Sequence, residues 1–149
     1  MVLLVDDNQD DVELTLRSFH RHKLASRVVV ARSGEEALDY IFAKGSYANR
    51  APDELPGMVL LDLKLPRIDG FEVLRQIRAN SLTKYVPVIV LTTSSQMSDK
   101  FQSYDGGANS YVRKPVNFDQ FIEVTRQLGI YWLMVNESLP VGESKPGGA

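Results

Sequence analysis

Residues 58–66 read MVLLDLKLP, a short apolar run that ends at an acidic residue, Asp62. Such a run, too short for a helix and bounded by turn residues, is typical of a strand buried on both faces of a sheet. Residues 2–5 (VLLV) and 86–91 (VPVIVL) have the same character, and polar residues follow each of them. The sequence therefore predicts buried strands that carry polar residues at their carboxyl ends.

Helical patterns alternate with these strands. We expect helices over residues 10–24, 33–44, 69–79, 95–105 and 118–136, and two further strands over residues 27–31 and 109–112. Ser33 and Glu36 form a capping box at the start of the second helix. Residues 45–57 contain two prolines and are typical of a long loop. This alternation predicts an α/β fold, a doubly wound parallel sheet of five strands with helices on both faces.

Length and composition suit a single domain. The chain has 149 residues and an apolar fraction of 44%, and we expect a domain over residues 1–138 and a disordered tail over residues 139–149. The absence of cysteine excludes disulfides and thiolate metal sites, and it fits a cytoplasmic protein. A net charge of −2 without a basic stripe argues against DNA binding, and no apolar run approaches the ~20 residues that span a membrane.

The candidate functional residues lie at the ends of the predicted strands. Asp6 and Asp7 follow the first strand and Asp62 ends the third. Thr92 follows the fourth strand and Lys114 the fifth. In open α/β sheets, sites form beyond the carboxyl ends of the strands, so we expect these side chains to converge.

Three clustered carboxylates repel one another, and a hard divalent cation relieves this repulsion. Mg²⁺ prefers a few carboxylates and accepts phosphate oxygens as further ligands. Beside such an ion, Asp62 can attack a phosphoryl group while Lys114 and the Thr92 hydroxyl each bind one of its oxygens. The sequence thus indicates phosphoryl transfer to Asp62.

Each of these residues also has an ordinary explanation. An acid after a strand is most often a turn or cap residue, so Asp6 and Asp7 would simply cap the first helix. Lys114 alone is typical of a solvated surface, and Thr92 alone of a strand end. The joint placement at four strand ends favours the functional interpretation, because one mechanism requires this set of groups together.

The same segments resemble the receiver domains of two-component response regulators. The matching segments are LLVDDN (3–8), LLDLKLP (60–66) with DG (69–70), PVIVLTT (87–93), GANSY (107–111) and KP (114–115). In the family's order they cover residues 2 to about 128. The resemblance implies a flavodoxin-like fold with strand order 2-1-3-4-5. It also implies that the chain is a signalling switch rather than a metabolic enzyme, although it catalyses its own phosphorylation and dephosphorylation.

For the site, the resemblance implies that Asp62 is the phosphoacceptor and that Lys114 binds the phosphoryl group. It places Mg²⁺ on Asp7, Asp62 and the backbone carbonyl of Lys64, with Asp6 completing the metal site through a bound water. Some receivers carry a neutral or acidic residue where Lys64 stands, so the rate of self-dephosphorylation does not transfer from the family to this chain.

Two further expectations come from the resemblance. Thr92 and Tyr111 match the switch pair, in which phosphorylation draws the threonine forward and the tyrosine turns inward. The peptide bond before Pro115 is expected to be cis.

The C-terminal segments FDQF (118–121) and LGIYWLMVN (128–136) look like single-domain regulators paired with phytochrome-like sensor kinases. The expected phosphoryl donor is therefore a sensor histidine kinase, phytochrome-like in this narrower likeness, or a phosphotransfer protein.

Other classes fit less well. A phosphatase of the haloacid type would carry a second aspartate two residues after the nucleophile, where this chain has Lys64. An EF-hand beginning at Asp6 lacks the glycine and glutamate that its calcium loop requires. A pseudo-receiver, an interaction module without phosphorylation, would have lost part of the catalytic set, which is complete here.

The final helix predicts self-association. Phe118, Phe121, Ile122, Thr125, Leu128 and Trp132 share one helical stripe that can face the core. Tyr131, Leu133, Met134 and Val135 cannot all share it, because successive residues turn by ~100°. An exposed apolar end favours a twofold homodimer through the fourth helix, fifth strand and fifth helix, and the alternative is that this end folds back onto its own domain.

Overall fold

The computed structural model describes residues 1–25 and 27–139 and contains one parallel sheet. Its strands are β1 (Val2–Val5), β2 (Val28–Ala31), β3 (Met58–Leu61), β4 (Val88–Thr92) and β5 (Ser110–Arg113). They run in the order β2-β1-β3-β4-β5, with Leu4 of β1 opposite Val30 and Leu60. The predicted doubly wound sheet and its 2-1-3-4-5 order are confirmed.

The connecting helices are α1 (Gln9–His22), α2 (Gly34–Ile41), α3 (Gly70–Ala79), α4 (Met97–Asp105) and α5 (Phe118–Ile130). Polar side chains cap the start of each connecting helix except α4. The Ser33 hydroxyl accepts from the Glu36 N–H, while the Glu36 carboxylate accepts from the N–H of Arg32. The predicted capping box is confirmed, with the carboxylate reaching one residue further back than Ser33.

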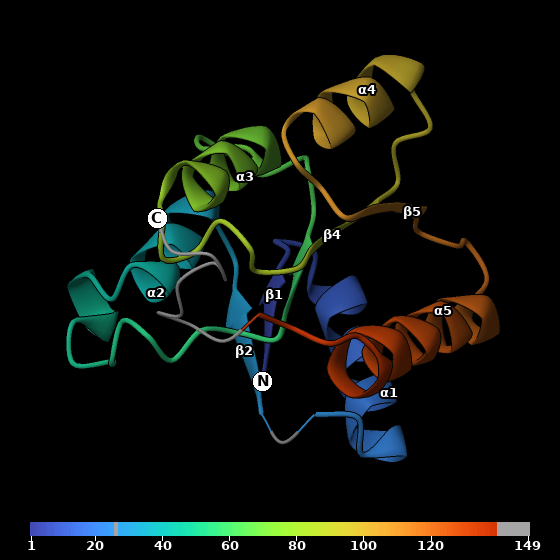
Figure 1. Ribbon diagram of the computed structural model, residues 1–149. Helices are drawn as coiled ribbons and strands as arrows, with labels where there is room; N and C mark the ends of the chain where they lie inside the picture. The colour runs from blue at the N-terminus through green and yellow to red at the C-terminus, as the bar shows by residue number, and fades with distance from the viewer. Residues whose placement is uncertain (26, 140–149) are drawn as a thin grey trace.

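Alternating strand residues build one core on each face of the sheet. Leu3 and Val5 face the side covered by α2 and α3, whereas Val2 and Leu4 face the side where α1 and α5 lie together (Figure 1). The three central strands, β1, β3 and β4, lie between these layers and are buried at every residue. This two-sided burial explains the continuous apolar runs in the sequence.

Two segments differ from expectation. The expected loop over residues 45–57 contains a short 3₁₀ helix, η1 (Gly45–Tyr47). The final helix, expected to be continuous to residue 136, changes after Ile130 into a π-helical turn, η2 (Tyr131–Val135). Wider π-helical turns reorient successive side chains, which periodicity calculated for an α-helix does not anticipate.

The apolar residues of the C-terminal segment divide between core and surface. Trp132 and Leu133 pack against the core beneath α1 and α5, whereas Tyr131, Met134 and Val135 are exposed. Phe118 is 46% exposed, so its expected place in the core was wrong. As the first residue of α5 its side chain points back toward the helix N-terminus, away from the packed stripe.

The predicted tail over residues 139–149 lies outside the described residues except for Leu139. Among the residues that are described, no helix combines the length and apolar character needed to cross a bilayer.

Candidate functional site

The sheet's hydrogen bonding extends one residue past the strands and fixes the site backbone. The Asp6 N–H donates to the carbonyl of Ala31 at 3.0 Å, and the Asp62 N–H donates to the carbonyl of Val5 at 3.0 Å. Between β4 and β5, at the same carboxyl ends of the strands, the Lys114 N–H donates to the Thr92 carbonyl at 2.7 Å. Residues from four strand ends are therefore held at one edge by the same ladder that builds the sheet.

Three carboxylates meet at this edge. One oxygen each from Asp6, Asp7 and Asp62 lies within 4.8 Å of the other two. Asp6 and Asp62 are buried and Asp7 is exposed, so the group opens to solvent on one side. Neither Asp6 nor Asp7 caps α1, because the Asn8 side chain takes that position and accepts from the Asp11 N–H. An all-oxygen donor set of this kind fits a hard divalent cation.

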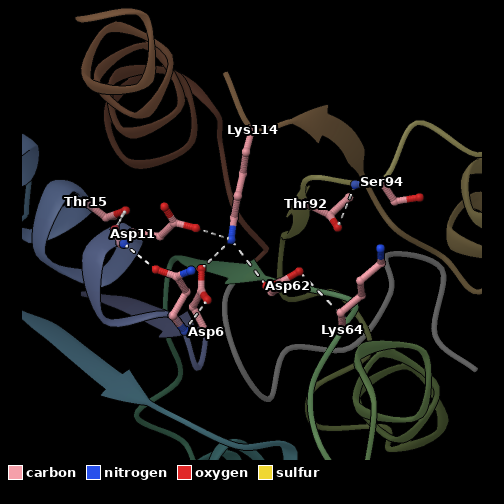
Figure 2. Close-up of polar contacts among 9 residues, drawn as sticks. Asp6, Asp11, Thr15, Asp62, Lys64, Thr92, Ser94 and Lys114 are labelled. Carbon is pink, nitrogen blue, oxygen red and sulfur yellow. Dashed lines mark hydrogen bonds and ion pairs between the residues drawn. The ribbon is translucent and has the colours of Figure 1, made fainter. Parts of the chain in front are cut away.

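The ammonium group of Lys114 lies in the middle of the acidic residues (Figure 2). Its Nζ is 2.8 Å from a carboxylate oxygen of Asp6, 2.8 Å from one of Asp11 and 3.3 Å from one of Asp62. The Lys114 side chain is only 5% exposed, so these contacts are shielded from water. A buried cation with three acidic partners is held at a defined point beside Asp62.

Burial and charge act against each other at this point. Burial opposes ionisation of Lys114, but Asp62, Asp11 and Asp6 outweigh it and raise the pKa of the amine above its usual range. Burial also raises the pKa of the Asp6 carboxyl, although Lys114 and the Asn8 N–H act in the opposite direction. Lys114 is thus a permanent cation of the site.

The other side of the site centres on Thr92 and Tyr111. Thr92 is fully buried, and its hydroxyl oxygen accepts from the Ser94 N–H at 3.3 Å. The Tyr111 hydroxyl donates to the Ser94 carbonyl at 2.8 Å, and its ring packs against the core cluster. Tyr111 is therefore held against the core by its ring and by its hydroxyl.

Lys64 lies next to Asp62 in the site. The Lys64 N–H lies 3.4 Å from a carboxylate oxygen of Asp62, and its side chain stands on the far side of Asp62 from Asp11 (Figure 2). The peptide bond before Pro115 is trans, because the described residues contain no cis peptide bond, so the expectation of a cis bond was wrong.

Comparison with known proteins agrees with this geometry. Residues 2–126 match the model of the response regulator receiver domain. The chain belongs to this receiver family. FilR2 of Methanothrix harundinacea, named as a probable methanogenesis regulatory protein, is 38% identical over 138 residues, 93% of this chain and 86% of FilR2. Response regulator Rcp1 of Synechocystis is 32% identical over 133 residues, 89% of this chain and 88% of Rcp1.

Solved structures of receivers are similar over almost the whole chain. The phosphorylated cyanobacterial phytochrome response regulator RcpA superposes with a TM-score of 0.86 at 36% identity, covering 92% of this chain and 96% of RcpA. The Mn²⁺-bound form of Rcp1 gives a TM-score of 0.85 at 31% identity, covering 93% of this chain and 97% of that one. This receiver is therefore similar to single-domain, phytochrome-associated response regulators along its full fold.

Two residues of the receiver site escaped the sequence-based prediction. Asp11 lies in the first turn of α1, but its partner Lys114 is 103 residues away in the chain, so spacing along the sequence does not indicate the pair. Ser94 links Thr92 to Tyr111 through its backbone, so no side-chain pattern in the sequence signals its role.

Proposed function

We propose that this receiver domain accepts a phosphoryl group on Asp62 from a phosphohistidine of a sensor histidine kinase or phosphotransfer protein. The observation that carries this proposal is the contact between the buried Lys114 ammonium and Asp62, at the edge where Asp62 also meets Asp6 and Asp7. A nucleophile, a fixed cation and a metal-type donor set therefore share one partly open site.

The chemistry is an in-line displacement at phosphorus. A carboxylate oxygen of Asp62 attacks the phosphorus, the P–N bond to the donor imidazole breaks, and its electron pair stays on the imidazole nitrogen. In this proposal Lys114 donates to one phosphoryl oxygen and the Thr92 hydroxyl, which accepts from the Ser94 N–H, donates its own proton to another. The protein contributes alignment and charge neutralisation, which are the main requirements of a loose transition state.

We propose Asp6, Asp7, Asp62 and the backbone carbonyl of Lys64 as the residues that hold Mg²⁺. Bound there, the ion would neutralise charge on the phosphoryl oxygens and on the clustered carboxylates. The acidic set fits this role in donor chemistry, and the similar protein Rcp1 has a Mn²⁺-bound form. Asp6 is the more buried ligand and Asp7 is the more accessible one.

We propose that Thr92 and Tyr111 transmit the phosphorylated state. Phosphorylation adds roughly two negative charges at Asp62, which favours a Thr92 hydroxyl turned toward the new group. The link from Thr92 through Ser94 to the Tyr111 hydroxyl connects that event to β5, and the Ser94 hydroxyl, which donates to Asp99, connects it to α4. The inward Tyr111 of this structure then represents the switched packing, and phosphorylation shifts the population toward it. Thr92→Ala should leave phosphorylation possible and uncouple it from Tyr111.

We propose a phytochrome-like sensor kinase as the donor, a cytoplasmic location, and action through protein partners without DNA binding. Support comes from RcpA, which is described as a phytochrome response regulator, and from the low net charge of −2. We assign residues 1–138 to the receiver domain.

We also propose a twofold homodimer through α4, β5 and α5. Exposed apolar side chains lie on α4 and on η2, which continues α5; they are Met97, Phe101, Tyr104, Tyr131, Met134 and Val135. Surfaces of this kind usually mark an interface. Sedimentation should show wild-type dimers that dissociate in a Phe101→Ser, Tyr131→Ser, Met134→Ser variant, and a wild type that stays monomeric at high micromolar concentration with and without phosphorylation would contradict the dimer.

The deciding experiment is phosphorylation by acetyl phosphate and Mg²⁺ followed by intact mass measurement. Wild type should gain one phosphoryl group, and Asp62→Asn should gain none. Absence of uptake by folded wild type would indicate a pseudo-receiver instead. Repeated release of phosphate from unrelated monoesters would indicate the phosphatase alternative.

A further inference from the structure

Lys114 has one acidic partner that the proposed metal site does not use. Asp6 and Asp62 belong to the group of carboxylates that lie within 4.8 Å of one another, whereas Asp11 does not. Asp11 nevertheless contacts the ammonium at 2.8 Å, as closely as Asp6 does. In Figure 2 the amine lies between Asp11 on the α1 side and Asp62 on the opposite side.

The position of Asp11 is fixed by the start of α1. Its N–H donates to the Asn8 side chain at 3.1 Å, and its carbonyl accepts from the Thr15 hydroxyl at 2.8 Å. The next residue, Val12, is fully buried in the core. The Asp11 carboxylate therefore projects from an anchored turn toward the ammonium, with its side chain 22% exposed and that of Lys114 5% exposed.

A bound divalent cation would change the electrostatic attraction between Lys114 and its other two partners, Asp6 and Asp62. Once Asp6 and Asp62 share their charge with a metal, their attraction for the ammonium weakens, and the two cations repel each other. Of the three carboxylates that contact Lys114, only Asp11 keeps its full charge for it. A long lysine side chain without such an anchor has several rotamers away from Asp62.

We propose that Asp11 is a positioning residue that holds the Lys114 ammonium beside Asp62 while the metal site is occupied. This inference rests on the proposed function, which it deepens. Asp11 acts through Lys114 and does not touch the phosphoryl group. It keeps the amine ready to donate to a phosphoryl oxygen and keeps it from competing with the metal for Asp6 and Asp62.

The first test compares Asp11→Asn with Asp10→Asn. Asp10 lies in the same first turn, is exposed, and loses the same charge when changed, but it has no ion pair with Lys114. Phosphorylation by acetyl phosphate at saturating Mg²⁺ should slow roughly 5- to 20-fold in Asp11→Asn, which keeps an acceptor oxygen but exchanges a charge-assisted hydrogen bond for a neutral one, and less than about 2-fold in Asp10→Asn. Asp11→Glu should recover much of the rate. Equal rates for the two asparagine variants would overturn the proposal.

The second test asks whether Asp11 affects the phosphorylation rate through Lys114 or through a general change in structure. In a Lys114→Met background, Asp11→Asn should slow phosphorylation no more than Asp10→Asn does. An undiminished effect of Asp11→Asn in that background would show that Asp11 does not act through Lys114.

A third test needs no phosphorylation. In Mg²⁺ titrations of the unphosphorylated protein, Asp11→Asn should weaken the apparent affinity roughly 3- to 10-fold more than Asp10→Asn, because the released ammonium then competes for Asp6 and Asp62. Equal affinities would overturn the proposal even if Lys114→Met is inactive. Uptake of a phosphoryl group by Asp62→Asn would instead refute the proposed function, so the two failures are distinguishable.

Discussion

Helices α1 and α4 stand on opposite sides of one site, but they are attached to the domain in different ways. α1 buries Val12, Thr15, Ser18 and Phe19, whereas Ser103 is the only buried residue of α4. The Asn8 side chain caps α1, and Gln96 at the start of α4 makes no side-chain cap bond. The side of the site that holds Lys114 is therefore anchored in the core, while the helix beside the Thr92–Tyr111 link buries little of its surface.

This difference suits the two tasks of a receiver. The proposed chemistry at Asp62 requires Lys114 at a fixed place, and α1, which carries its partner Asp11, is held by packing against α5, where the Ser18 hydroxyl donates to the Ile122 carbonyl at 3.1 Å. Signalling requires an element with little buried apolar area, since such elements change packing at small free-energy cost. On α4, Met97, Phe101 and Tyr104 are all more than half exposed, at 63%, 65% and 54%.

The largest predicted effect compares one phenylalanine from each helix. Phe19→Ala should lower the free energy of unfolding by about 3–5 kcal/mol, because the ring is 1% exposed and its removal leaves a cavity between α1 and α5. Phe101→Ala should change it by less than about 0.5 kcal/mol, because that ring is 65% exposed. Urea unfolding of the two variants measures both values. Similar losses would show that α4 is as firmly packed as α1.

The same contrast shows where sequence reasoning succeeded. β3 and its neighbours were predictable because two-sided burial leaves continuous apolar runs, and the site residues at the strand ends followed from the chain order. The exposed Phe118 and the π-helical turn after Ile130 were not predictable, because they depend on where a helix ends relative to the sheet. Asp11 was missed for a related reason, since its partner Lys114 is 103 residues away in the chain.

Magnesium should stabilise the folded protein through the acidic side of the site. At 100 times its dissociation constant, a ligand that binds only the folded protein adds about 2.7 kcal/mol to the free energy of unfolding. Asp7→Ala should lose most of this gain and bind Mg²⁺ more weakly, yet remain folded, because Asp7 is exposed. Urea unfolding of both proteins with and without Mg²⁺ provides the measurement. Wild-type affinity in Asp7→Ala would count against the proposed metal site.

The cap of α1 should matter for stability and for chemistry together. Asn8→Ala should cost about 1 kcal/mol of unfolding free energy and also slow phosphorylation, because the capped turn carries Asp11. Asn117→Ala is the matched control, since Asn117 caps α5 in the same way with no contact to the site acids. It should cost about as much stability and leave the phosphorylation rate unchanged. If both variants slowed phosphorylation equally, the rate would simply follow stability.

The smallest predicted effect concerns the missing cap of α4. Gln96→Asp places a short carboxylate at the position where side chains accept from the first free N–H groups of a helix, and it should stabilise α4 by about 0.5–1 kcal/mol. Gln96→Asn, without the charge, should give a similar gain, which separates capping from electrostatics. We expect α4 to open locally rather than with the whole domain, so its amide hydrogens should exchange about 2- to 5-fold more slowly in these variants while those of α1 stay unchanged. Slowing of both helices by the same factor would mean that α4 opens only when the entire domain unfolds, and the two sides of the site would then not differ in mobility.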